Sequence, residues 1–141
     1  MPKLKIYTDG GARGNPGPAA CGAVIKNEKE EIILEASKFI GIATNNQAEY
    51  KALILALEEV QNIFTKEKPG EKHIECHLDS ELVVKQLNRE YKIKNEGLKP
   101  LFARARDLIS SFDSVKFTYI PREKNKLADK LVNKELDSRE K

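Results

Sequence analysis

The sequence is poor in the residue types that mark membrane proteins, secreted proteins and thiol-based sites. No apolar run in its 141 residues approaches the roughly 18 residues that a membrane-spanning helix requires. The first ten residues lack the apolar stretch and cleavage site of a signal peptide. The two cysteines, Cys21 and Cys76, match neither a metal motif nor a disulfide framework. We therefore expect a cytoplasmic protein with reduced thiols and no membrane partner.

Length and charge indicate one domain with a strongly charged surface. A chain of 141 residues can bury a single sizeable core, so we assign residues 1–141 to one domain with its core at about 3–136. Charged residues make up 33% of the chain, and the net charge is +3. This basic excess is too small to establish a nucleic-acid partner by itself. No obligate protein partner is evident, and we expect a monomer.

Hydrophobic periodicity predicts an α/β protein. We expect strands at residues 4–9, 20–26, 31–40, 73–78 and 115–120, and helices at about 46–64, 82–87, 100–112 and 127–136. Residues 66–72, which include Pro69 and Gly70, are expected to form a loop. The strands are too few and too mixed for a doubly wound nucleotide-binding fold, and a five-stranded sheet with helices on its faces fits the order.

Acidic residues stand at the ends of two expected strands. Asp9 ends the first and Asp79 the fourth, which returns parallel to the first because a long helix connects them. If the two strands are neighbours, both carboxylates lie at the edge where open α/β sheets bind ligands. Glu49 and Asp129 stand in the first turns of two helices. Each also has an ordinary alternative as a capping or helix-dipole partner.

Four segments in order resemble ribonuclease H type 1: YTDGGARGNPGPAACGAVI, TNNQAEYKALILAL, LDSELVVKQLN and LADKLVN. The resemblance covers about residues 3–136. It implies the ribonuclease H-like fold, an α/β fold with a five-stranded mixed sheet in the order 3-2-1-4-5 and helices on both faces. It also implies an endonuclease that hydrolyses the RNA strand of RNA/DNA hybrids. The chain resembles a short form, without a basic protrusion or an N-terminal hybrid-binding domain.

The resemblance implies that Asp9, Glu49, Asp79 and Asp129 are the catalytic, metal-binding carboxylates. Two like charges about 4 Å apart cost roughly 4 kcal/mol at an effective dielectric near 20, so four close carboxylates need cations among them. Hard oxygen ligands suit Mg²⁺, with Mn²⁺ as a substitute. The implied two-metal-ion mechanism gives 5′-phosphate and 3′-hydroxyl products. Asp9 and Asp79 would bridge the first ion, Glu49 would orient the substrate side, and Asp129 would hold the water-side ion.

The resemblance also implies how the RNA strand is recognised. Asn15, Asn45 and Asn46 match positions that contact the RNA strand near its 2′-hydroxyls. The backbone at Gly10 and Gly11 is expected to assist them, because glycine lacks the Cβ that would obstruct a nucleic-acid strand. As caps of the long helix, the two adjacent asparagines have an additional structural role.

Only some of the positions that contact the DNA strand in this family are matched in the sequence. Thr44 and Asn95 match a pocket for a DNA-strand phosphate, but Ile42 stands where many relatives have an arginine. The pocket is therefore weaker, or Lys94 compensates. The chain has no tryptophan, and only residues 88–97 stand where many relatives carry a basic protrusion. Tyr91, Lys92 and Lys94 are the candidate strand contacts there, and a solvated charged loop is the equal alternative.

The loop before Asp129 has no histidine, although many relatives place one there. Arg122 is our first candidate for its role, because a guanidinium can hydrogen-bond a phosphate oxygen bidentately. Glu123, which could help a metal ion leave, is the second candidate, and a solvated loop arginine is the structural alternative.

Three other functions stay open from the sequence. A DNA enzyme of the same fold is disfavoured by the three asparagines, and a binding module without catalysis is disfavoured by the four acids. Additional cleavage of double-stranded RNA is neither favoured nor opposed by any residue.

Overall fold

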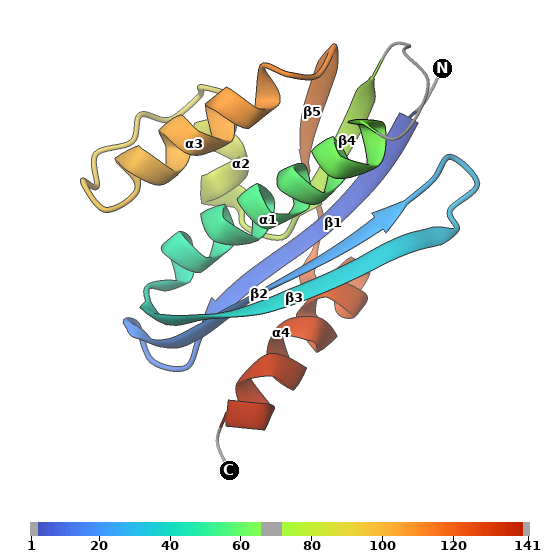
Figure 1. Cartoon of the computed structure of the whole chain (residues 1–141). Coiled ribbons are helices and arrows are strands. Elements are labelled where there is room, and N and C mark those ends of the chain that lie inside the picture. The colour runs from blue at the N-terminus through green and yellow to red at the C-terminus, as the bar shows by residue number, and fades with distance from the viewer. Residues whose placement is uncertain (1–2, 66–71, 140–141) are drawn as a thin grey trace.

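The computed structural model describes residues 3–65 and 72–139, so most of the loop expected at 66–72 lies outside the described residues. Five strands form one sheet in the order β3-β2-β1-β4-β5, which confirms the predicted order (Figure 1). β1 pairs antiparallel with β2 and parallel with β4; β2–β3 is antiparallel and β4–β5 parallel. The strands are β1 Lys3–Ala12, β2 Gly17–Lys26, β3 Ile32–Ala43, β4 His73–Leu78 and β5 Ser114–Tyr119.

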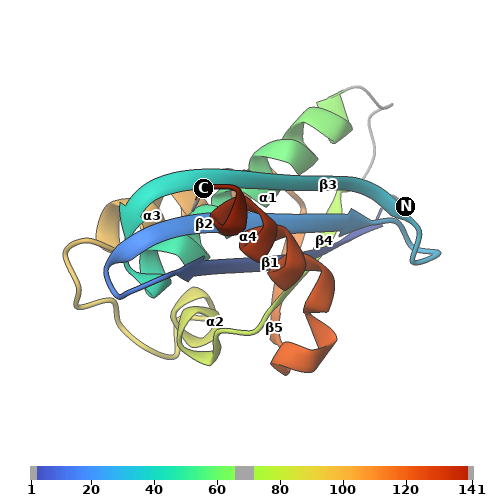
Figure 2. The same cartoon turned by 90° about the horizontal axis from the view of Figure 1, so that it is seen from below.

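Helices lie on both faces of the sheet, as predicted. Helix α1 crosses one face with α3 packed beside it, and α4 crosses β1 and β2 on the opposite face (Figure 2). The helices are α1 Asn45–Thr65, α2 Glu81–Leu87, α3 Lys99–Ile109 and α4 Lys126–Arg139, and a 3-10 turn occupies Arg122–Lys124. None of the helices within the described residues is long and apolar enough to span a membrane.

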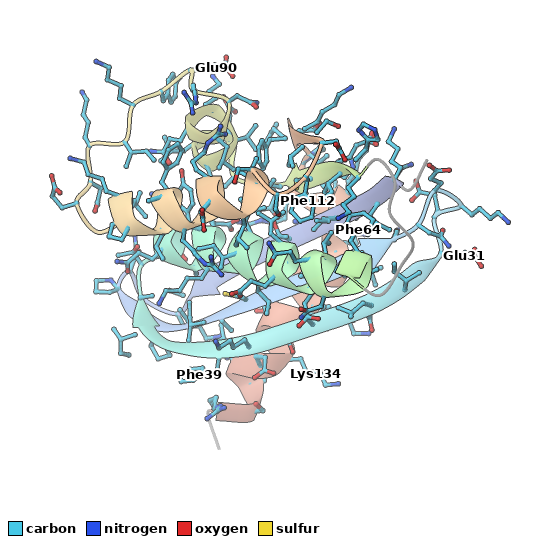
Figure 3. The ribbon with its side chains drawn as sticks, turned by 45° about the horizontal axis from the view of Figure 1, so that its top comes forward. Glu31, Phe39, Phe64, Glu90, Phe112 and Lys134 are labelled. Carbon is cyan, nitrogen blue, oxygen red and sulfur yellow. The ribbon has the colours of Figure 1, made fainter. Side chains whose placement is uncertain are left out.

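The main core lies between the sheet and α1. Strand alternation turns Ile6 of β1 and Leu78 of β4 toward Leu53 of α1, and all three are fully buried. At the far end of α1, the rings of Phe64 and Phe112 lie beside each other with centroids 6.0 Å apart (Figure 3). This apolar layer holds the strands that carry the acidic residues.

The two cysteines behave as expected. Cys21 on β2 and Cys76 on β4 flank β1, and both are free and buried. They contribute apolar volume to the fold.

The glycine-rich segment after Asp9 differs from the prediction. β1 continues through Gly10 and Gly11 to Ala12, because these residues pair with residues 19–21 of β2. The connecting loop is therefore only residues 13–16. A Cβ on Gly10 would lie 2.2 Å from the carbonyl carbon of Ala48, so α1 occupies the space that the missing side chain leaves. The interpretation that Gly10 opens this space to a nucleic-acid strand is wrong.

The end of α3 also differs from the prediction. The helix ends at Ile109, three residues earlier than expected. The hydroxyls of Ser110 and Ser111 donate to the carbonyls of Asp107 and Leu108, and such bonds compete with continued helix.

We expect Gly10→Ala to destabilise the fold by about 1–3 kcal/mol or more, since α1 would have to move away from β1. Gly11→Ala is the matched control, because its Cβ would meet only Cγ1 of Val132 at an ordinary 3.6 Å. Urea unfolding of both variants measures the difference. Equal losses for the two variants would contradict the proposed close approach of α1.

Candidate active site

The parallel pairing of β1 with β4 places two aspartates side by side. Thr8 pairs with Leu78, so Asp9 and Asp79 follow at the same carboxyl edge. Side chains alternate along β1, so the Asp9 carboxylate leaves the sheet on the face that α4 crosses, away from the main core. One of its oxygens lies within 4.8 Å of an oxygen of Asp79. The predicted juxtaposition of these two residues is confirmed.

Helix α1 supplies a third carboxylate. Oε1 of Glu49 accepts a hydrogen bond of 3.2 Å from the backbone N–H of Gly10, across the close contact between α1 and β1. One oxygen from each of Asp9, Glu49 and Asp79 lies within 4.8 Å of the others. Oε2 of Glu49 is buried without a hydrogen-bond partner among the described residues. An unpartnered buried oxygen beside two carboxylates is suited to a cation.

Asp129 enters the same cavity from the first turn of α4. The cavity has a volume of about 410 Å³, and all four predicted carboxylates line it. The side-chain amide of Asn133, one turn further along α4, donates to the Asp129 carboxylate at 3.3 Å. Asp129 lies outside the group of three described above, and its charge nevertheless acts on Asp9. The structure therefore brings the four acids together.

Burial and mutual repulsion make the cluster costly to ionise. Asp9 and Glu49 are buried, with 7% and 6% of their surfaces exposed. Burial, followed by the charge of Asp79, raises the pKa of Asp9 to about 7. Burial, followed by the charge of Asp9, raises the pKa of Glu49 well above its ordinary value. A bound divalent cation would reverse both effects, and oxygen-only ligands fit Mg²⁺ or Mn²⁺.

Asn125 is a site residue whose role sequence reasoning missed. Its side chain is 1% exposed, and its amide nitrogen donates to the carbonyl of Thr8 at 2.7 Å and to the Asp79 carboxylate at 3.1 Å. The backbone carbonyl of Asn125 accepts a hydrogen bond from the N–H of Asp129 as α4 begins. Asn125 thus joins β1, Asp79 and the helix that carries Asp129. An asparagine at a helix N-terminus was the available signal, but its contacts depend on the fold.

Two of the predicted recognition asparagines hold the loop at residues 13–16 against α1. Oδ1 of Asn45 accepts from the N–H of Ala12, and Oδ1 of Asn15 accepts from the N–H of Asn45, both at 2.9 Å. Asn45 and Asn46 line the acidic cavity, as do Gly10 and Gly11. The predicted RNA-strand residues therefore lie on or beside one wall of this cavity.

The two residues predicted to form a DNA-strand pocket, Thr44 and Asn95, do not line the acidic cavity. Thr44 caps α1 by exchanging hydrogen bonds with Gln47. The Gln47 amide and Oδ1 of Asn95 both lie close to Gly97, each 3.0 Å from the position of a Cβ added there. Thr44 and Asn95 are thus brought to the same region through Gln47. Ile42, which stands where many relatives have an arginine, is 71% exposed.

The remaining candidates are divided between two places. Lys92 and Lys94 are exposed on the loop after α2 and do not line the acidic cavity. Arg122 lines that cavity, whereas Glu123 lines a separate hollow with Tyr7 and Lys26. This placement favours Arg122 over Glu123 as a neighbour of the acids.

Comparisons with known proteins agree with this fold and site. The family model described as Reverse transcriptase-like matches residues 7–135. The chain is 43% identical over 135 residues to ribonuclease HI of Halobacterium salinarum, covering 96% of this chain. The solved structure of LC11-RNase H1, isolated from compost by a metagenomic approach, is 47% identical with a TM-score of 0.91 over the full length of both chains. LC11-RNase H1 in complex with RNA/DNA hybrid is 46% identical, with a TM-score of 0.91, and covers 98% of this chain and 99% of that one.

The five-stranded order, with acids where the pairing of β1 with β4 ends, is thus the ribonuclease H-like fold. The chain belongs to the Reverse transcriptase-like family and, within it, to ribonuclease H type 1. It spans 65% of the length of the Halobacterium protein and 36% of a bifunctional protein of Mycobacterium tuberculosis.

In EDTA, we expect the free energy of unfolding to fall as the pH rises from about 4 to about 8. The pKa of Asp9 is about 7 in the folded chain against an ordinary 3.8, so the unfolded chain gives up this proton at a lower pH than the folded chain does. The stability that the protonated Asp9 gives the folded chain is therefore complete below about pH 4 and is lost as the pH rises through 7. Asp9→Asn should therefore be at least as stable as the unchanged chain at pH 8, and its advantage should shrink at pH 5.

Thermal unfolding at both pH values, with and without Mg²⁺, measures this difference. Asp107→Asn is the control, since that carboxylate is exposed on α3 and does not line the acidic cavity. A stability difference between Asp9→Asn and the unchanged chain that does not vary with pH would contradict the prediction.

We expect Asn125→Ala to destabilise the chain by about 1–3 kcal/mol, because the buried carbonyl of Thr8 loses its donor. It should also weaken Mg²⁺ binding, measured by calorimetry, because Asp79 is no longer held. Asn88→Ala is the control, since Asn88 donates to a strand carbonyl, that of Phe117, at 3.4 Å and touches no acid of the cluster. Loss of stability with unchanged Mg²⁺ affinity would limit Asn125 to a structural role.

Proposed function

We propose that the chain is a ribonuclease H that hydrolyses the RNA strand of RNA/DNA hybrids with divalent metal ions. The observation that carries the proposal is the group of three carboxylate oxygens within 4.8 Å of one another, two of them on buried residues, in a cavity of about 410 Å³. Support also comes from LC11-RNase H1, a relative 46% identical whose structure holds an RNA/DNA hybrid.

The four carboxylates would hold the metal ions. Asp9 and Asp79 lie where one ion can be shared, Glu49 adds an oxygen from α1, and Asp129 faces them from α4. Two Mg²⁺ ions, when bound, would activate a water molecule and stabilise the leaving 3′ oxygen, giving 5′-phosphate and 3′-hydroxyl products. The backbone N–H of Gly10 keeps Glu49 oriented, and the amides of Asn125 and Asn133 orient the two less buried aspartates.

The asparagines supply donors suited to ribose. The hydrogen bonds described for the Asn15 and Asn45 side chains use their oxygens and not their NH₂ groups. A 2′-hydroxyl can accept from such a group, and DNA has none at that place. Asn46 contributes from the cavity wall. These three residues would therefore select the RNA strand.

Residues around the acidic cavity would bind phosphates of the two nucleic-acid strands. Arg122 lines the cavity without belonging to the acidic group, so its guanidinium can contact the scissile phosphate while the acids hold the ions. Thr44 and Asn95 would receive a DNA-strand phosphate, with Lys94 or Lys92 on the exposed loop nearby in the chain.

The deciding experiment compares cleavage of end-labelled RNA/DNA hybrid, RNA duplex and DNA duplex in Mg²⁺ and in EDTA. We expect Mg²⁺-dependent cleavage of the RNA strand of the hybrid, no cleavage of DNA duplex, and products with 5′-phosphates. Asp9→Asn and Asp79→Asn should abolish cleavage, whereas Asp107→Asn, an exposed aspartate on α3, should not.

Each other outcome has a definite meaning. Cleavage of DNA duplex at a similar rate would favour the DNA-enzyme alternative, and hybrid binding without cleavage would favour a binding module. Cleavage of RNA duplex beside the hybrid would widen the substrate range. Normal turnover by Asp9→Asn would show that the acidic cavity is not the active site.

A further inference from the structure

Arg13 stands in the short loop between β1 and β2, where both its backbone and its side chain are fixed. Its N–H donates to the carbonyl of Pro18 at 2.8 Å. A Cβ on Gly17 would lie 2.1 Å from the carbonyl oxygen of Arg13, so glycine is required for this tight turn. The guanidinium donates to the Asp137 carboxylate near the end of α4 at 2.6 Å. The side chain is thus aimed along α4.

Arg13 lines the acidic cavity from the end opposite to the 3-10 turn. Val132, Asn133 and Leu136 of α4 form the wall between the acids and this end. Among the described residues that line the cavity, Arg13 and Arg122 are the basic ones. Arg13 is four residues beyond Asp9 along an extended segment, which places their Cα atoms about 13 Å apart. A strand crossing the acids therefore passes Arg13 at a phosphate other than the scissile one.

Stability does not account for the ion pair of Arg13. The side chains of Arg13 and Asp137 are 32% and 68% exposed, and ion pairs in such positions typically contribute about 0–1 kcal/mol. The planar fork of a guanidinium matches the geometry of a phosphate group. The pair is better suited to orienting a cation than to holding the fold.

We propose that Arg13 binds a non-scissile backbone phosphate of the RNA strand and that Asp137 orients it before the substrate arrives. This subsite rests on the proposed function, since it assumes an RNA strand over the acidic cavity. It resolves an electrostatic difficulty, because four carboxylates repel a polyanion and the cavity needs cations at its margin. Arg122 and Arg13 would then hold the strand on either side of the metal-binding acids.

The first test measures steady-state cleavage of a hybrid by Arg13→Ala, Arg13→Lys and Asp137→Ala. We expect Arg13→Ala to raise KM about fivefold to tenfold with little change in kcat, and Arg13→Lys to recover part of the loss. Binding of hybrid in EDTA should lose about 0.9 from the slope of log K against log salt in Arg13→Ala, the value for one phosphate contact. Asp137→Ala keeps the cation, so its slope should stay unchanged while KM rises less.

The second test locates the phosphate. RNA strands that carry one neutral methylphosphonate at a time are annealed to DNA, and their affinities for the two proteins are compared. The unchanged chain should lose affinity at several positions, and Arg13→Ala should become insensitive at one non-scissile position only.

Specific results would overturn the subsite. The subsite is wrong if the unchanged chain and Arg13→Ala give identical methylphosphonate profiles. It is also wrong if Arg13→Ala and Asp137→Ala raise KM equally while the salt slope of Arg13→Ala stays that of the unchanged chain. Either result would assign the pair to loop structure and leave hybrid cleavage intact. If the unchanged chain cleaved no hybrid, both the proposed function and the subsite would fail.

Discussion

The parallel pairing of β1 with β4 is the constraint on which the rest of the site depends. Thr8 lies opposite Leu78, so the next residue of each strand is an aspartate at the same edge. Burial and the neighbouring negative charge oppose ionisation there, and the pKa of Asp9 rises to about 7 as a result. The repulsion must be overcome by contacts elsewhere. The apolar layer under α1, where Ile6 and Leu78 are fully buried, supplies them on the opposite face of the same strands.

Helix α1 connects that core to the acidic cluster. Its apolar side covers the sheet, while its first turns reach the edge where β1 carries Asp9. The approach is possible because Gly10 has no side chain between the strand and the carbonyl of Ala48. The same closeness lets the N–H of Gly10 donate to Glu49. One glycine therefore determines both the packing of the longest helix and the orientation of its carboxylate.

Sequence reasoning succeeded where structure follows from local spacing and general topology. Strand alternation and the helical period of residues 46–64 predicted the elements, and the long helical connection required β4 to return parallel to β1. It failed at Gly10 to Ala12, because a glycine remains in a strand only when a partner strand pairs with it. It did not predict the contacts of Asn125 with Thr8 and Asp79, because these partners are far away in sequence. The pairing of Arg13 with Asp137 has the same long-range character.

The distribution of charge around the cavity follows from what a metal-binding cluster needs. Within residues 3–65 and 72–139, no described ion pair includes any of the four acids. Their described partners are neutral donors, the N–H of Gly10 and the amides of Asn125 and Asn133. A lysine or arginine in these places would fix the carboxylates equally well, but it would cancel the negative charge that attracts a divalent cation. Neutral donors fix the geometry and preserve that charge. The arginines therefore stand at the margin of the cavity, where they can meet phosphates without competing for the acids.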